Sequence, residues 1–249
     1  MKQPGRVVFI GAGPGAADLI TLRGLRFLAA ADVVLFDALT DPALRELAPR
    51  AKWVNVGKRG FCDSTGQTTI NALLVKHANE VATVVRLKGG DPSVFGRLEE
   101  ELDALSAAGI ACEIVPGVTA AIAAAAATQR PLTRRGNGRS VSLTTAMTRE
   151  GQLHAARTAD TEVFYMAGKQ LAALARRLIA TGWAEDTPVS VVSRAGWPDQ
   201  LHSDHPLREL GRASMLHAGR PTIVTIGAGA APLAQAVQTR SRVATGIPS

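Results

Sequence analysis

Two glycine-rich segments place bare backbone directly after strand-like runs of apolar residues. The first is "VVFIGAGPG" at 7–15 and the second is "VVRLKGGDP" at 84–92. Glycine has no Cβ, so its main-chain atoms can approach a ligand closely and its N–H groups can face an anion or a polar ligand atom. Ligands of open α/β sheets bind beyond the carboxyl ends of the strands, so two such loops predict one composite pocket.

An aspartate follows the second strand-like run and could carry chemistry. Asp37 comes directly after "DVVLF" at 32–36, where a carboxylate could hold the ribose of a dinucleotide. The first glycine loop fits a dinucleotide poorly, because Pro14 removes one N–H and the spacing is not G-x-G-x-x-G. A nicotinamide- or flavin-dependent oxidoreductase therefore stays an alternative from a different enzyme class.

Strand-like and helical patterns alternate through the first half of the chain. Apolar strand patterns followed by helical patterns predict a mostly parallel sheet that is covered on both faces. The expected strands are 6–10, 32–36, 53–56, 83–87 and 112–116, and the expected helices are 19–31, 68–78 and 98–109. In the first helix, the leucines at 19, 22, 25 and 28 are expected to form one face.

The pattern changes after Pro116, where we expect a second α/β unit. An alanine-rich helix at 119–128 leads into a basic loop at 134–140. Further strands are expected at 140–146, 161–166, 188–194 and 221–227, with a helix at 169–182. The sequence thus predicts two α/β domains, 1–116 with the glycine loops and 117–249, which ends in a short flexible tail.

Composition limits the classes of partner. The net charge of +7 suits an acidic ligand, whereas 4% aromatic residues is poor equipment for stacking single-stranded bases. The positive charge is scattered along the chain, so we expect no nucleic-acid partner, with a basic RNA-directed protein kept as an alternative. The longest apolar run is too short to span a membrane. Two unpaired cysteines and the lack of a signal peptide favour a reducing, cytoplasmic setting.

A metal site is the weakest of the candidate chemistries. His202, Asp204 and His205 in "LHSDHP" could ligate a metal ion, but the sequence contains no second cluster of ligands to support them. We expect an exposed polar loop at this position and no metal.

The motifs, taken in order, resemble the tetrapyrrole (corrin/porphyrin) methylase family. The matching segments run from residue 7 to about residue 228. They are "GAGPGAADLITLRG", "ADVVLFDALT", "VGKR", "VVRLKGGDPSVFGR", "IVPGVTAA", "RPLTRRG", "VFYM", "TPVSVVSRA" and "RPTIVTIG". Each segment alone is weak evidence, but the ordered series is specific.

The resemblance implies a two-domain α/β fold with a cofactor cleft between the domains, and usually a homodimer. The cofactor is S-adenosyl-L-methionine, which becomes S-adenosyl-L-homocysteine. The motifs are most similar to those of members that methylate uroporphyrinogen III at C2 and C7 to give precorrin-2, at the entry to sirohaem and cobalamin. "GDPSVFG" and "SRAGWPDQ" are partly similar to members acting on precorrin-4, so a later precorrin is the alternative substrate.

The resemblance also assigns roles to residues. By motif position, Asp37 and Lys58 match the positions of general acid/base chemistry, and Arg97 and Arg135 match arginines that suit the carboxylates of the substrate. The expected cofactor contacts are Pro14, Gly89, Gly90, Asp91, Val94, Thr119, Ala120, Met166 and Ala195. The chain departs from the family pattern at Phe61, Asp63, Leu98, Glu99, Arg134 and Ala195.

Overall fold

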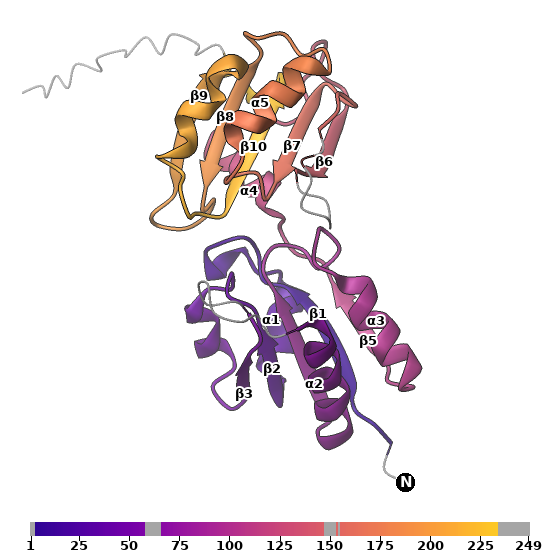
Figure 1. Ribbon diagram of the computed structural model, residues 1–249. Coiled ribbons are helices and arrows are strands. Elements are labelled where there is room, and N and C mark those ends of the chain that lie inside the picture. The colour runs from indigo at the N-terminus through magenta and orange to yellow at the C-terminus, as the bar shows by residue number, and fades with distance from the viewer. Residues whose placement is uncertain (1–2, 58–65, 147–152, 154, 234–249) are drawn as a thin grey trace, which may run out of the picture.

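The chain folds around two five-stranded sheets, which lie in separate units joined through the segment after β5 (Figure 1). The computed structural model describes residues 3–57, 66–146, 153 and 155–233. Within these ranges, no helix combines the length and the hydropathy needed to cross a bilayer. The division into a mixed α/β pair of units agrees with the expected fold, while the boundary at residue 116 stays a prediction.

The first sheet is parallel throughout, with the strand order β3-β2-β4-β1-β5. Its strands are β1 (Arg6–Gly11), β2 (Val33–Phe36), β3 (Lys52–Asn55), β4 (Thr83–Lys88) and β5 (Cys112–Val115). The helical segments between them are η1 (Ala17–Leu19), α1 (Leu22–Ala29), η2 (Pro42–Leu47), α2 (Gln67–Glu80) and α3 (Leu98–Ala107). The expected strands and helices of this half are therefore all present.

Strand alternation divides the first core into two layers. On β1, Val8 and Ile10 pack with Leu28 of α1, whereas Val7 and Phe9 pack on the opposite face with residues of α2 and α3. Successive side chains of a strand point to opposite faces, so one apolar run can serve both layers. Helices thus cover both faces of the sheet, as a buried parallel sheet requires.

The expected helix at 19–31 is wrong in its start and in its apolar face. Thr21 is extended and its side chain accepts a hydrogen bond from the N–H of Gly24, so this N-cap starts α1 at Leu22. Leu22 is 74% exposed, whereas Gly24 and Leu28 are buried. Leucines three residues apart drift around a helix with 3.6 residues per turn, so the four leucines do not share one buried face.

The second sheet is mixed, with the strand order β6-β7-β10-β8-β9. Only its β6–β7 pair is parallel among the pairs of the described strands. The strands are β6 (Val141–Thr145), β7 (Thr161–Tyr165), β8 (Pro188–Ser193), β9 (Leu201–Pro206) and β10 (Thr222–Gly227). The helical segments are α4 (Ala120–Ala127), α5 (Leu171–Ala180), η3 (Leu207–Ser214) and η4 (Ala228–Ala230). Alanines of α4 pack on one face of this sheet, and leucines of α5 and η3 pack on the other.

The segment that was expected to be an exposed loop is the edge strand β9. Its residues pair with β8 in an antiparallel register, in which Asp204 lies opposite Ser190. The side chain of Asp204 accepts a 2.6 Å hydrogen bond from Arg130 and a 3.0 Å hydrogen bond from His202. Polar alternation on an edge strand resembles a loop in sequence, which is why the strand was missed. Within the described ranges, no three His, Cys, Asp or Glu residues are grouped as a metal ion would require.

A buried histidine predicts a pH dependence of stability. His217 is fully buried, and its Nδ1 and Nε2 lie 2.6 Å from Ser193 Oγ and 2.9 Å from Ser203 Oγ. Burial is the largest cause that lowers its pKa, followed by the positive charges of His205, His202 and Arg220. Because the folded pKa lies below the unfolded one, the unfolded chain binds the proton first as the pH falls.

We therefore expect the free energy of unfolding to decrease below about pH 6.5, by at most about 1.4 kcal/mol per pH unit for this group. Urea unfolding at several pH values between 7.5 and 5 measures the slope. A His217→Gln variant should show a shallower slope, and an unchanged slope would assign the effect to other groups.

Candidate active site

The two glycine loops meet at the centre of the first sheet. Strands β1 and β4 are neighbours, and their loops form a bridge in which Gly13 N–H donates to Gly90 O at 3.2 Å and Gly90 N–H donates to Gly13 O at 2.7 Å. From β1 the chain crosses over to β2 on one side of the sheet, and from β4 it crosses over to β5 on the other side. This is the switch point of an open α/β sheet, where ligands bind.

The glycines allow backbone to approach backbone. A Cβ atom on Gly11 would lie 2.5 Å from Gly117 Cα and 2.7 Å from Gly90 O, and neither backbone atom can give way without moving a loop. Gly90 has a φ of 73°, in the left-handed region that glycine adopts most easily. Three segments far apart in the sequence can therefore pack backbone against backbone, because their glycines have no Cβ.

We expect Gly11→Ala to lower stability by about 1–3 kcal/mol, the usual cost of overpacking, and to weaken the binding of any ligand held by these loops. Thermal unfolding and calorimetric titration with S-adenosyl-L-homocysteine measure the two effects. Gly66→Ala is the stability control, because its Cβ would have Thr69 Oγ1 at 4.0 Å as its nearest neighbour. Equal stability of the two variants would contradict the packing argument.

A cavity of about 510 Å³ opens at this switch point, between the two units. Its lining includes Asp37, Pro14, Gly89, Gly90, Asp91, Val94, Arg97, Thr119, Ala120, Met166 and Ala195, all singled out from the sequence. Arg135 is exposed and lies outside the described lining. Lys58 lies outside the described residues, as do Phe61 and Asp63. Of the expected site residues that the structure describes, all but Arg135 line this cavity.

Backbone strain is concentrated at the cavity. Phe95, Arg97, Met166 and Arg194 have φ values of 54°, 53°, 57° and 51°, and all four line the cavity. A left-handed conformation is unfavourable for residues with a Cβ and persists where the surrounding structure enforces it. The strain therefore marks the cavity as a functional region, and it adds Phe95 and Arg194 to the residues that the sequence indicated.

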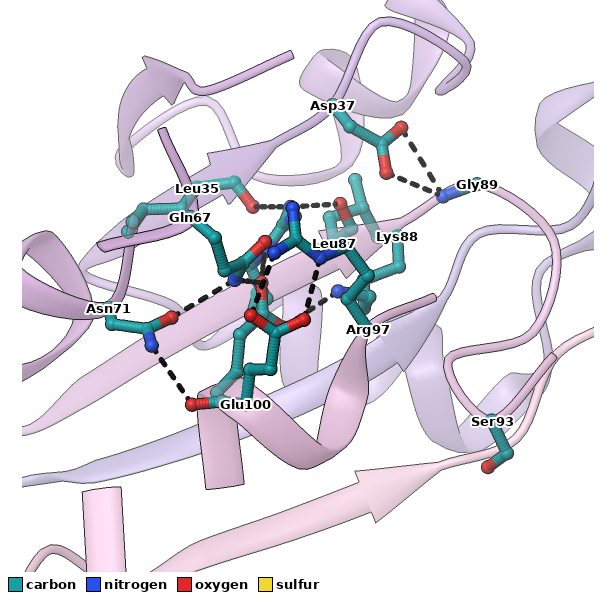
Figure 2. Close-up of polar contacts among 12 residues, drawn as sticks. Leu35, Asp37, Gln67, Asn71, Leu87, Lys88, Gly89, Ser93, Arg97 and Glu100 are labelled. Atoms are coloured by element: carbon teal, nitrogen blue, oxygen red, sulfur yellow. Dashed lines mark hydrogen bonds and ion pairs between the residues drawn. The ribbon is translucent and has the colours of Figure 1, made fainter. Parts of the chain in front are cut away.

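Asp37 lines the cavity and is held by backbone donors. Its carboxylate accepts from the N–H of Gly89 at 3.2–3.3 Å (Figure 2). It also accepts from the N–H of Leu39 at 3.1 Å. The side chain is half-buried, so it can reach a ligand in the cavity while its rotamer is fixed. A carboxylate in this position can accept a proton or hold a polar ligand group.

Asp91 ties the second glycine loop to the start of the next segment. Its carboxylate accepts hydrogen bonds from the N–H groups of Gly117 and Ser93, each at 2.8 Å. Arg97 lies just beyond this loop and pairs through Nε and Nη2 with Glu100 at 2.7 Å. The loop 89–97 is thus fixed by its own polar side chains, and Arg97 is oriented by a neighbouring carboxylate.

A buried ionic cluster forms the wall of the cavity beneath Asp37. Glu101 is fully buried and accepts from Arg86 Nε at 3.0 Å and from Lys88 Nζ at 2.6 Å. Gln67 Nε2 donates to the same carboxylate at 3.3 Å (Figure 2). Burial is the main cause that lowers the pKa of Lys88, followed by the nearby charge of Arg86, while Glu101 and Asp37 act in the opposite direction.

Aromatic residues form a second wall of the cavity, with Tyr165 and Trp197 from the second unit and Phe95 from the first. The Tyr165 hydroxyl lies 2.7 Å from Thr119 Oγ1, and its ring lies 4.9 Å from that of Phe95. Trp197 donates from its indole nitrogen to Pro14 O at 2.9 Å, and the Arg194 guanidinium lies over its ring at 4.3 Å. The Tyr165–Phe95 and Trp197–Pro14 contacts join the two units across the cavity.

Sequence reasoning missed the members of both walls. Arg86 and Lys88 did carry a usable signal, since two cations stand two residues apart in an otherwise apolar strand. Such residues share one face of the strand and must be paired if that face is buried. Tyr165 and Trp197 carried no such signal, because a single aromatic residue is more often part of the core than of a ligand site.

Comparison with known proteins agrees with this architecture. The sequence model of the family Tetrapyrrole (Corrin/Porphyrin) Methylases matches residues 6–211 of this chain. A uroporphyrinogen-III C-methyltransferase of Pseudomonas aeruginosa is 44% identical over 90% of this chain and 93% of that protein. A siroheme synthase of Hahella chejuensis is 43% identical over 91% of this chain, which spans about half (50%) of that longer protein.

Solved structures give the same result. The uroporphyrin-III C-methyl transferase of Thermus thermophilus, complexed with S-adenyl homocysteine, is 35% identical and has a TM-score of 0.79 over 90% of this chain and 97% of that one. A cobalt precorrin-4 methyltransferase is 31% identical, also with a TM-score of 0.79, over 91% of this chain and 96% of that one. The chain therefore belongs to the tetrapyrrole (corrin/porphyrin) methylases.

Proposed function

We propose that the protein transfers methyl groups from S-adenosyl-L-methionine to C2 and C7 of uroporphyrinogen III, giving precorrin-2. The main support for this reaction is the cavity between the two units. Its lining contains Asp37, Arg97 and the nine residues that are expected to contact the cofactor. The family and the similar uroporphyrinogen methyltransferases support the same reaction. The product stands at the entry to sirohaem and cobalamin.

The residues of the cavity fit the methyl donor. Its volume of about 510 Å³ is within the usual range for small-molecule sites, about 300–1,000 Å³. Gly89 and Gly90 offer bare backbone, while Val94, Met166 and Ala195 offer apolar surface. S-adenosyl-L-methionine supplies an activated, electrophilic methyl group. Pro14, Asp91, Thr119 and Ala120 complete the proposed cofactor contacts.

The protein contributes mainly by positioning the methyl donor and the substrate, and it must also accept a proton from the substrate. Asp37 is held by the N–H of Gly89, next to the proposed cofactor loop, where its carboxylate can accept the proton that leaves a methylated pyrrole ring. Lys58 is proposed as its acid/base partner from motif position alone. Fixed geometry in a cavity partly shielded from water accounts for the rest of the rate enhancement.

The acidic substrate requires cations. Arg97 lines the cavity and is proposed to pair with a carboxylate side chain of the tetrapyrrole, for which a guanidinium is well shaped. Arg135 stays a prediction from motif position, with its side chain outside the described lining of the cavity. A homodimer in the cytoplasm is also proposed, from the family resemblance.

Anaerobic incubation of the protein with S-adenosyl-L-methionine and uroporphyrinogen III tests the proposal, with product mass and absorbance as readouts. We expect a product that carries two additional methyl groups. Binding of S-adenosyl-L-homocysteine without methyl transfer would reassign the substrate to a later precorrin, which the similarity to a cobalt precorrin-4 methyltransferase favours as the second candidate. Failure of both binding and transfer would exclude the proposed reaction.

The oxidoreductase alternative finds no support in the site. A dinucleotide site would need the G-x-G-x-x-G spacing, which the first glycine loop lacks, and Pro14 removes one of its N–H donors. Titration with NAD and NADP, followed by fluorescence, is expected to show no saturable binding.

A further inference from the structure

The ionic cluster on the cavity wall has more donors than acceptors. Arg86 and Lys88 are each 4% exposed, and both line the cavity. A lysine carries three N–H donors and an arginine carries five. Lys88 bonds to Glu101, while Arg86 uses Nε for Glu101 and Nη1 for the carbonyl oxygen atoms of Leu35 and Leu87. Among the described residues, Arg86 Nη2 has no hydrogen-bond partner.

The cluster also has more positive than negative charge. One buried carboxylate, Glu101, is bonded to two buried cations. Asp37 lies close enough to raise the pKa of Lys88, but among the described residues no hydrogen bond or ion pair joins its carboxylate to Lys88 or Arg86. Buried cations are normally matched by anions. A second carboxylate that entered from the cavity would complete the pairing.

We propose that Arg86 and Lys88 form a subsite that binds a carboxylate of a ligand, with Glu101 as the positioning residue that holds both cations. The subsite rests on the proposed function, and that reaction offers two sources of a carboxylate. One is an acidic side chain of the tetrapyrrole, and the other is the methionyl carboxylate of the methyl donor. Both would be bound by charge-assisted hydrogen bonds to the same wall.

Lys88→Met tests the subsite, because it removes one cation and leaves the Arg86–Glu101 pair balanced. Lys76→Met is the matched control: it removes the same charge from the surface of α2, where the side chain is 63% exposed. Lys88→Gln is a second variant, which keeps a donor for Glu101 without the charge. Thermal unfolding establishes that each variant is folded.

Two binding measurements identify the source of the carboxylate. Uroporphyrin III, an oxidised relative of the substrate with the same acidic side chains, is titrated by quenching of its fluorescence, and S-adenosyl-L-homocysteine is titrated by calorimetry. We expect Lys88→Met to raise the Kd of uroporphyrin III and the KM of uroporphyrinogen III at least about tenfold, with the Kd of S-adenosyl-L-homocysteine unchanged. The Lys76→Met control is expected to match the wild type.

The remaining outcomes are equally specific. A selective rise in the Kd of S-adenosyl-L-homocysteine would assign the subsite to the methionyl carboxylate and still support it. Wild-type affinities of both ligands in folded Lys88→Met and Lys88→Gln would overturn the subsite. Failure of the wild type to methylate uroporphyrinogen III would overturn the proposed function instead, because the two binding measurements do not depend on turnover.

Discussion

Replacing Asp37 with alanine should lower kcat for uroporphyrinogen III by about 10²–10⁴-fold, the usual contribution of a positioned acid/base group. The carboxylate stands at the end of β2, held by the N–H groups of Gly89 and Leu39. Removing it abolishes the proton acceptor and also frees the loop that carries the proposed cofactor contacts. The anaerobic methylation assay measures kcat, and calorimetry with S-adenosyl-L-homocysteine measures what remains of the site.

Asp37→Asn separates the two roles of this side chain. The amide oxygen can still accept from the N–H of Gly89, so the loop should keep its geometry and the Kd of S-adenosyl-L-homocysteine should change little. An amide is a far weaker base than a carboxylate, so kcat should still be low. A wild-type kcat in Asp37→Asn would contradict the acid/base role and leave Asp37 as a residue that positions the loop.

Glu101→Gln should cost about 3–5 kcal/mol of stability, as expected when one partner of a buried ionic group is removed. Glu101 is fully buried and bonded to both Arg86 and Lys88, so its neutral replacement leaves two buried cations without a counter-ion. Urea unfolding monitored by circular dichroism measures the loss. Arg97 and Glu100 form an exposed pair close by, so Glu100→Gln is the control, with an expected effect below about 1 kcal/mol.

The cost in Glu101→Gln should depend on pH and on Lys88. Glu101 raises the pKa of Lys88 against the lowering effect of burial, so its removal lowers that pKa further. A lysine whose folded pKa lies below its unfolded pKa destabilises the fold while it is protonated, and this penalty is relieved as the pH rises through the folded pKa.

Stability of Glu101→Gln should therefore recover toward alkaline pH. Adding Lys88→Met should also restore part of the loss at neutral pH, because only one uncompensated cation then remains. If the double variant is no more stable than Glu101→Gln, the two charges are not coupled in the way that the structure indicates.

The roles of Arg86 and Lys88 depend on three parts of the structure, namely β4, α3 and the cavity. Arg86 and Lys88 lie on the same face of β4 because they are two residues apart, and a strand alternates its faces. Their role depends on α3, which brings Glu101 against that face, and on the cavity, which leaves the other side open to a ligand. Strand β4 supplies the two cations, and helix α3 supplies the carboxylate that pairs with both.

The sequence by itself determined the parallel sheet, its two covered faces and the two glycine loops. These features depend on local patterns, namely apolar alternation, helix periodicity and residues without a Cβ, which do not require knowledge of distant partners. Asp37 and the loop residues Gly89 and Gly90 were found in the same way, because the carboxyl ends of parallel strands lie at one edge of the sheet.

Only the tertiary structure decided the rest. The start of α1 depends on the hydrogen bond between Thr21 and Gly24, and β9 is a strand because β8 offers an unpaired edge, although its own residues are polar. The walls of the cavity join residues that are far apart in the chain, such as Trp197 with Pro14. Hydrogen-bond partners and burial at such separations are set by how the sheets pack, which no local pattern encodes.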